Sequence, residues 1–288
     1  MAGLGMIRNL QIGRHKFGVA CAALVLFLGG CAPLEQENTR PLAQSKSCRY
    51  CDLRYKDFVV TDLAGAYLYG ADFSWSILTS GTLQSATLNR ARFEWADLKG
   101  IDLSKASLQD AVFYSSNLTR ANLRMADFSR ANMRSADLSE SDGVTANFEH
   151  TNLIDAWMNS SIFRAADFRD ANLTGARLRE ADFQGARFNR ADMRGIDAQG
   201  ANFAGADLQD TNFALTALSH TNFRSANLRR AKFGGAYLDA VNFQGADLGG
   251  ADFSGAITRN VIFLGANLCG ATLPNGSRGE CEGKEEPI

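Results

Sequence analysis

The sequence is poor in the residues and patterns on which several protein functions depend. Its 288 residues include only 4 prolines, 3 histidines and 6 cysteines, so little material is available for metal chemistry. No apolar run reaches the roughly 18 residues of an ordinary membrane-spanning helix. The formal net charge of −1 excludes both a strongly basic nucleic-acid-binding protein and a highly charged disordered chain.

The usual signatures of catalysis are missing as well. We find no paired catalytic acids, no Gly-rich phosphate loop and no nucleophile elbow. We therefore expect no enzymatic activity, no catalytic residue, no cofactor and no metal site.

The first 30 residues have the composition of a secretory signal. Residues 1–16 contain three basic residues and no acidic one, and residues 17–30 are apolar but short for a membrane span. The segment ends Leu28-Gly29-Gly30-Cys31, which resembles the bacterial lipobox. That resemblance implies that Cys31 is lipidated and becomes the mature N-terminus. An ordinary cleaved signal and an uncleaved anchor are the alternatives.

A lipidated Cys31 implies a membrane-anchored lipoprotein of the bacterial cell envelope. In such lipoproteins an aspartate after the cysteine favours the inner membrane, so Ala32 favours the outer membrane where two membranes are present. Residues 31–47 contain two prolines and mixed charge, and we expect them to carry the anchor and form a flexible tether. The folded part is expected over 48–273, with a C-terminal cap or tail over 274–288.

A five-residue period governs the folded part. From Leu53 to Leu273 every fifth residue, here called a centre, is Leu, Phe or Met, except at Gly143, Ala198 and Thr258. The residue two before each centre is small, usually Ala, and Asp or Asn usually stands between them. This period fits neither a helix nor a long strand, and it requires a short extended piece and a corner in each unit. We expect the centres and the small residues to face one continuous core of stacked units.

The spacing of phenylalanine predicts how many units complete one coil. Phe centres are paired most often at a separation of 20 residues, as in Phe183, Phe203 and Phe223. Because aromatic rings pack well on rings in adjacent layers, this spacing predicts four units per coil and a Phe203 buried between its two neighbours.

Units such as Ala201-Asn202-Phe203-Ala204-Gly205 resemble those of the pentapeptide-repeat family, and the resemblance covers residues 51–273. It implies an all-β fold, a right-handed parallel β-helix of quadrilateral cross-section. The number of units predicts about eleven coils, or about 50 Å of stacked layers.

The exceptions predict weak layers. At Gly143 we expect a local void or a backbone adjustment with Val144 turned inwards, and a hinge is the alternative. Ile196 is large for its small-residue position, and a volume exchange with Ala198 explains both. Thr258 predicts thinner packing towards the C-terminal end.

Four cysteines lie at the two ends of the repeat. Cys48 and Cys51 bracket the entry to the first coil, whereas Cys269 lies in the last coil and Cys281 in the tail. In an oxidising compartment we expect the local disulfides 48–51 and 269–281, although four cysteines allow three pairings. A redox-active Cys-x-x-Cys is the alternative, but no thioredoxin-like context accompanies it.

Two outward columns are candidate sites. One corner carries largely alternating charge, which predicts a ladder of surface ion pairs; His150 and Asp170 are neighbours there, without a nucleophile or an oxyanion motif. Its members are Arg90, Asp110, Arg130, His150, Asp170, Arg190, Asp210 and Arg230. A second corner carries Tyr55, Trp75 and Trp95. These aromatics either stack on one another in solvent or form a docking strip for an envelope protein or the membrane surface.

Two functions of different classes follow. The first is a non-enzymatic, lipid-anchored envelope scaffold or protein-interaction rod, which binds an unknown envelope protein or the membrane surface and no nucleic acid. The alternative is a cytoplasmic, topoisomerase-binding mimic of DNA, as gyrase-protecting pentapeptide-repeat proteins are thought to be. The repeat region has 22 basic and 25 acidic residues, and this near balance, together with the export signal, favours the scaffold.

Overall fold

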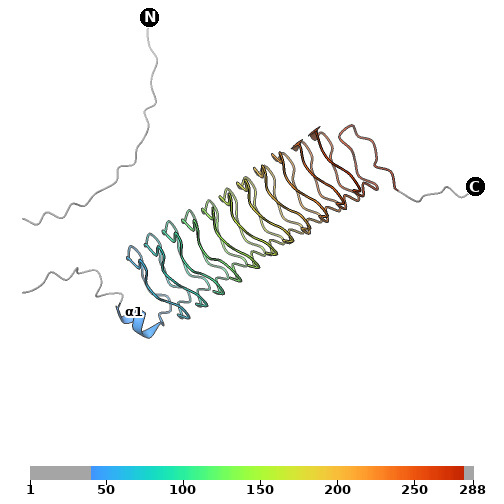
Figure 1. The fold of residues 1–288 in the computed structure, drawn as a ribbon. Helices are drawn as coiled ribbons and strands as arrows, with labels where there is room; N and C mark the ends of the chain where they lie inside the picture. The colour runs from blue at the N-terminus through green and yellow to red at the C-terminus, as the bar shows by residue number, and fades with distance from the viewer. Residues whose placement is uncertain (1–39, 282–288) are drawn as a thin grey trace, which may run out of the picture. The chain divides into compact units, whose positions relative to one another are not determined.

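The structure, a computed structural model, describes residues 40–281. The predicted signal segment, Cys31 and residues 282–288 lie outside the described residues. The elements are the helix α1 (Arg40–Ser45) and the short strands β1 (Tyr237–Asp239) and β2 (Ile257–Arg259). Between them the chain winds in coils that are stacked along one axis (Figure 1).

Adjacent coils are joined by parallel backbone bridges that link residues 20 positions apart. These bridges run from Ser47↔Tyr67 to Asp252↔Thr272, and β1 pairs with β2 in the same register. The spacing confirms four pentapeptides per coil. Each extended piece is one bridge long because a corner follows it at once, so β1 and β2 are the only longer strands within residues 40–281.

The backbone of each unit is satisfied by its neighbours. The N–H of Phe203 donates to the carbonyl of Asn222 in the next coil (2.7 Å), and the N–H of Asn202 donates to Ala181 in the previous one (2.9 Å). At the corner the N–H of Ala206 donates back to the carbonyl of Phe203 (3.0 Å). Every stacked layer therefore completes the hydrogen bonding of the layer beside it.

Each corner requires a left-handed residue two positions after the centre. The φ angle is positive at every fifth residue from Tyr50 to Gly270. This is the conformation demanded at the third residue of a type II turn, and glycine adopts it without a steric penalty. The requirement explains why glycine recurs in this phase of the repeat.

The Asp or Asn before each centre closes the corner and links the coils. The N–H of Ala64 donates to Asp62 Oδ1 (2.9 Å), as an Asx turn requires. Where the next coil places Asn in the same column, its amide donates to the residue below: Asn117 Nδ2 lies 2.9 Å from Asp97 Oδ1. The polar residue between the two inward-facing positions thus stabilises both the turn and the stacking.

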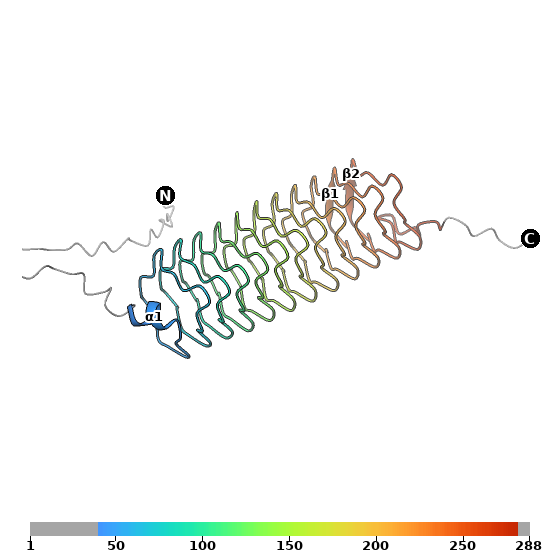
Figure 2. The same ribbon diagram turned by 60° about the horizontal axis from the view of Figure 1, so that its bottom comes forward.

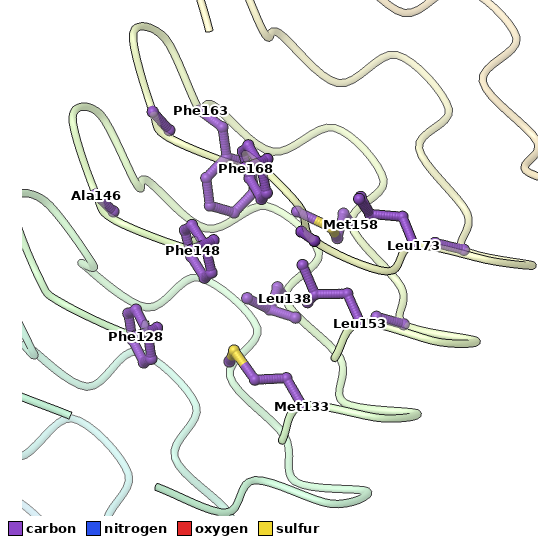
Figure 3. Packing of buried hydrophobic residues seen from close by; sticks show 14 of the residues in the cluster. Phe128, Met133, Leu138, Ala146, Phe148, Leu153, Met158, Phe163, Phe168 and Leu173 are labelled. Atoms are coloured by element: carbon purple, nitrogen blue, oxygen red, sulfur yellow. The ribbon is translucent and has the colours of Figure 1, made fainter. Parts of the chain in front are cut away.

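The core is a single column of centres and small residues. Phe203 is fully buried, and its ring stacks on Phe183 (centroids 5.0 Å apart) and on Phe223 (5.2 Å), which confirms the sequence prediction. Figure 3 shows the same arrangement for Phe128, Phe148 and Phe168, whose ring planes are within 4° of parallel.

Gly143 is accommodated in a way that the sequence did not predict. Val144 does not turn inwards; it is only half-buried, and the ring of Phe163 from the next coil fills the space instead. A Cβ at Gly143 would collide with Cδ1 and Cε1 of Phe163. Phe163 stays fully buried in edge-to-face contact with Phe148 (5.4 Å). The glycine is therefore part of a filled core rather than of a void.

The other two exceptions behave differently from each other. Ile196 and Ala198 are both buried, in agreement with a volume exchange within one layer. Thr258 lies in β2 and is exposed, and no described segment covers it on its outer side. The later centres Phe263 and Leu268 are only partly buried as well, in agreement with the predicted thinner packing towards the C-terminal end.

Both ends of the column are covered in part. At the N-terminal end α1 places Leu42 against the core, and the Leu42 carbonyl accepts a hydrogen bond from Lys46 N–H (2.8 Å). Residues 40–45 are thus helical, although the sequence predicted a tether through residue 47. At the other end residues 274–281 fold back, and Arg278 pairs antiparallel with Thr272. Figure 2 shows α1 and the β1–β2 pair towards opposite ends of the stack.

Replacing Gly143 with alanine should destabilise the protein by about 1–3 kcal/mol, because the new methyl group must displace the Phe163 ring from a well-packed core. Urea denaturation measures the change. Gly234→Ala is the matched control: neither glycine has a left-handed φ, and the nearest atom to a Cβ at Gly234 is the Ser254 carbonyl oxygen at 3.7 Å. Equal stability of the two variants would show that Phe163 does not occupy the space beside Gly143.

Candidate functional site

The aromatic strip, defined as Tyr55, Trp75 and Trp95, lies on one corner of three successive coils. The Tyr55 and Trp75 rings are stacked with centroids 6.5 Å apart, and Trp75 and Trp95 are stacked at 5.4 Å. Their exposed fractions are 71%, 52% and 48%. None of the three fills the core, so the strip is surface that folding does not require.

The stacking determines what the strip can contact. Because Trp75 has Tyr55 on one face and Trp95 on the other, its ring offers edges rather than an open face. Trp95 also meets Tyr114 edge-to-face at 5.6 Å. A sugar or a nucleobase needs an open face to stack on, whereas a protein or lipid surface can pack against a row of ring edges and polar tips.

A shallow charged hollow runs beside the aromatic strip, lined by Arg54, Asp72, Ser74, Arg92 and Glu94. Its polar groups already bind one another: Arg92 Nη2 lies 2.7 Å from Glu94 Oε2, and Ser74 donates to Asp72. At its margin two hydrogen bonds from the Arg54 side chain lower the pKa of Asp52 to about 2. The hollow presents satisfied ion pairs and no unpaired charge for a ligand to neutralise.

Three ion pairs join residues of adjacent coils along the charged corner. Arg130 binds Asp110, Arg190 binds Asp170 and Arg230 binds Asp210, each through Nε and Nη2. In every pair the arginine reaches back one coil. The column is therefore a set of two-layer clamps, as expected for a surface ladder.

His150 and Asp170 do lie together, and Glu149 joins them, with potential ligand atoms within 4.8 Å of one another. Both carboxylates already face arginines. Asp170 accepts two hydrogen bonds from Arg190 (2.8 and 2.6 Å), and Glu149 Oε1 lies 3.4 Å from Arg169 Nη2. A metal ion would have to compete with two guanidinium groups, so this geometry supports the ladder and not a metal centre.

Asp167 is a second charged feature, which the sequence analysis did not single out. It is the most buried carboxylate among residues 40–281, and it accepts hydrogen bonds from Arg169 and Arg187. Burial acts to raise the pKa of Asp167, but the hydrogen bonds from Arg169 and the charge of Arg187 hold it below its usual value. The sequence could have indicated this contact, because Asp167 and Arg187 are 20 residues apart and therefore adjacent in neighbouring coils.

The sequence analysis also missed apolar corners near the N-terminal end. Tyr50 and Val60 are as exposed as Tyr55, at 64% and 72%, and the neighbouring Val59 is half exposed. The sequence could have indicated Tyr50 and Val60, because both continue the five-residue phase of Tyr55.

The four terminal cysteines form two local disulfides, Cys48–Cys51 and Cys269–Cys281. The first fixes the entry to the first coil. The second ties the tail to the last coil, where Gly279 N–H also donates to the Ala271 carbonyl (2.8 Å). Each disulfide therefore secures an end of the stack that lacks a full covering coil.

Over residues 40–281 these features define a solenoid of stacked five-residue units whose outer columns carry the charged and aromatic side chains. The chain belongs to the pentapeptide-repeat family: the family's profile, described as pentapeptide repeats, matches in eight copies. The matched residues are 47–79, 86–124, 126–164, 161–200, 199–235 and 236–274. Members of known structure are right-handed quadrilateral β-helices and are generally non-enzymatic structural or interaction proteins. No curated protein matches the chain.

Three solved structures illustrate the likeness. HetL, a pentapeptide repeat protein involved in heterocyst differentiation regulation from the cyanobacterium Nostoc sp. strain PCC 7120, is 26% identical, with 85% of this chain and 98% of HetL covered and a TM-score of 0.35. A trypsin-treated variant of QnrB1, a plasmid-mediated fluoroquinolone resistance protein, is 20% identical (68% and 88% covered, TM-score 0.42). A protein from the Arabidopsis thaliana thylakoid lumen is 27% identical (35% and 68% covered, TM-score 0.27). At these TM-scores the likenesses do not bear on function.

The charged corner predicts a dependence of stability on pH. Hydrogen bonds from the paired arginines lower the pKa of Asp110, Asp170 and Asp210 below the ordinary 3.8. Their contribution is therefore present above that value and is lost as the pH falls below it.

We expect the triple variant Asp110→Asn, Asp170→Asn, Asp210→Asn to be less stable than the native protein at neutral pH and to approach it at a pH of about 3. Urea denaturation across this range measures the difference. Arg130→Gln, Arg190→Gln, Arg230→Gln should give the same profile. A constant gap between native and variant proteins would show that these pairs do not cause the pH dependence.

Proposed function

We propose that the chain is a non-enzymatic scaffold of the bacterial cell envelope, anchored through a lipid on Cys31. In this proposal a right-handed β-helix of about eleven coils presents the aromatic strip to an envelope protein or to the membrane surface. The observation that carries it is the strip itself: three large aromatic side chains, about half exposed or more, stacked where the core does not need them. Exposed aromatics of this kind are enriched at interfaces.

The envelope location rests on the sequence. The apolar segment 17–30 ends in the lipobox-like Leu28-Gly29-Gly30-Cys31. Within residues 40–281 no helix is long and apolar enough to cross a membrane. In this proposal attachment depends on Cys31, which lies outside the described residues.

The surface chemistry favours a scaffold over a mimic of DNA. A DNA mimic must present carboxylates in place of phosphates, but the acids of the charged corner are each clamped by an arginine, and Asp167 is bound by two. Paired in this way, the carboxylates lose most of their attraction for a basic DNA-binding groove.

The anchor is tested by metabolic labelling with a fatty acid and by fractionation of the cells. Cys31→Ser should abolish both labelling and processing at this site, because the thiol is the proposed acceptor. Cys21→Ser is the matched control within the same apolar segment and should leave both unchanged. Labelling that persists in Cys31→Ser would contradict the anchor.

The strip is tested by crosslinking in intact cells. Trp75→Ala with Trp95→Ala should reduce recovery of the associated partner while leaving the fold intact, since each lost stacking contact contributes only about 0.5–1.5 kcal/mol and no core side chain changes. Trp157→Ala is the control for an exposed tryptophan elsewhere; it is 45% exposed and lies under Arg177. Recovery that depends on Arg130 and Arg190 but not on the tryptophans would place the site on the charged corner.

A further inference from the structure

Large apolar residues occupy the left-handed corners mainly at the N-terminal end of the repeat. Between residues 50 and 95, five of the ten corner residues are Tyr, Val or Trp. Between residues 100 and 270 only Met125 and Leu215 among the thirty-five corners are comparably large and apolar. Elsewhere these positions hold glycine, polar residues or, at Ala165 and Ala240, alanine.

Val60 shows that folding does not explain this distribution. It is β-branched, has a φ of 54° and is 72% exposed, so it combines an unfavourable backbone conformation with unfavourable solvation. Glycine, present at the next corner as Gly65, would remove both penalties. A strained residue that gains no burial indicates a role outside the folded chain.

The apolar corners are not confined to one side of the stack: they occupy three of the four corners of the first coil, and the fourth is Gly65. Tyr50, Tyr55 and Val60 occupy three successive corners of the first coil, which we call the apolar collar. The aromatic strip continues from Tyr55 along one corner through Trp75 and Trp95. A protein that docks on one side would contact one or two corners of a coil, whereas a planar surface met by the end of the stack contacts them all.

The charge around the apolar collar fits an anionic lipid surface. Residues 46–62 carry four basic side chains against three acidic ones. Lys46 pairs with Asp62 and Arg54 with Asp52, so Arg49 and Lys56 are the basic side chains of this segment that form no ion pair within residues 40–281. The Arg49 guanidinium lies 5.5 Å from the Tyr50 ring centre and 5.3 Å from that of Tyr69. Tyrosine and tryptophan interleaved with lysine and arginine is the composition that favours the boundary between lipid headgroups and water.

The covalent path from the proposed anchor is short. Eight residues separate Cys31 from Arg40, the first residue of α1. Even fully extended, this segment spans at most about 30 Å. A lipid on Cys31 would thus keep the first coil close to the bilayer surface.

The geometry points to a lipid-contact surface: the apolar collar rests in the headgroup region of a phospholipid bilayer, with the stack tilted so that the aromatic strip enters the same region. This inference rests on the proposed membrane location, and it names the bilayer as what the strip contacts. Trp157 lies four coils beyond Trp75, or about 20 Å along the stack, and stays in water.

Fluorescence quenching by brominated phospholipid tests the arrangement. The full chain is reconstituted into vesicles of phosphatidylcholine and phosphatidylglycerol with bromine near the headgroup end of the acyl chains. Trp95→Phe with Trp157→Phe retains only Trp75, and Trp75→Phe with Trp95→Phe retains only Trp157. We expect about twofold quenching of Trp75, because interfacial tryptophans lie at headgroup depth, and little quenching of Trp157.

A collar variant provides the second comparison. In the chain that retains Trp75, Tyr50→Ser with Val60→Gly should bring the quenching of Trp75 close to the level of Trp157. Both changes leave Tyr55 in place and suit the corner backbone, so thermal stability should not fall. Met125→Ser with Leu215→Ser removes the two distant apolar corners and should leave the quenching unchanged.

Sedimentation with vesicles and a parallel Cys31→Ser series separate this inference from the anchor. Quenching restricted to Trp75 supports the lipid contact in either series. Equal quenching of Trp75 and Trp157, or none for either in vesicle-bound protein, overturns it while lipid labelling of Cys31 still decides the anchor. Failure to sediment in both series likewise overturns the lipid contact.

Discussion

The parallel backbone ladder with its 20-residue register is the constraint on which the rest of the structure depends. Because each centre donates its N–H to the next coil and each bridging residue donates to the previous one, neither group has a partner within its own coil. The chain satisfies them only by stacking, and stacking fixes which residues face inwards, which form corners and which lie above one another. The phenylalanine columns, the Asn–Asp contacts and the ion-pair clamps all follow from that register.

The same register makes the surface a set of separate columns. A side chain meets its equivalents one coil before and after it, so a property that spreads over a surface must be repeated every 20 residues. Aromatic residues repeat in this way beside the N-terminal end, and charged residues repeat in the middle of the chain. Each column buries little area, and function is therefore expected to depend on extended contact rather than on a pocket.

The sequence predicts the repeating parts of this structure better than the exceptional ones. Phe203 could be placed because its neighbours in register are determined by the period alone. The filling of the space at Gly143 by Phe163 could not, since it depends on how a ring rotates between layers. Helix α1 was missed because six residues give no usable periodicity, and Leu42 gains its stability from the core it covers. The aromatic strip was visible from the 20-residue spacing, whereas Tyr50 and Val60 became significant only once their backbone angles were known.

The stacked architecture also has a mechanical consequence. A chain held at one end and pulled along the stack would load the ladder hydrogen bonds of one layer at a time, because each coil contacts only its two neighbours. Detaching one coil would exchange about 4.8 Å of folded height for some 70 Å of extended chain. The Cys269–Cys281 disulfide links residues 12 positions apart, so the segment between them could not extend to the length of a detached coil under such a load. The β-helix would then act as an extensible spacer that lengthens in discrete steps while its remaining coils stay folded.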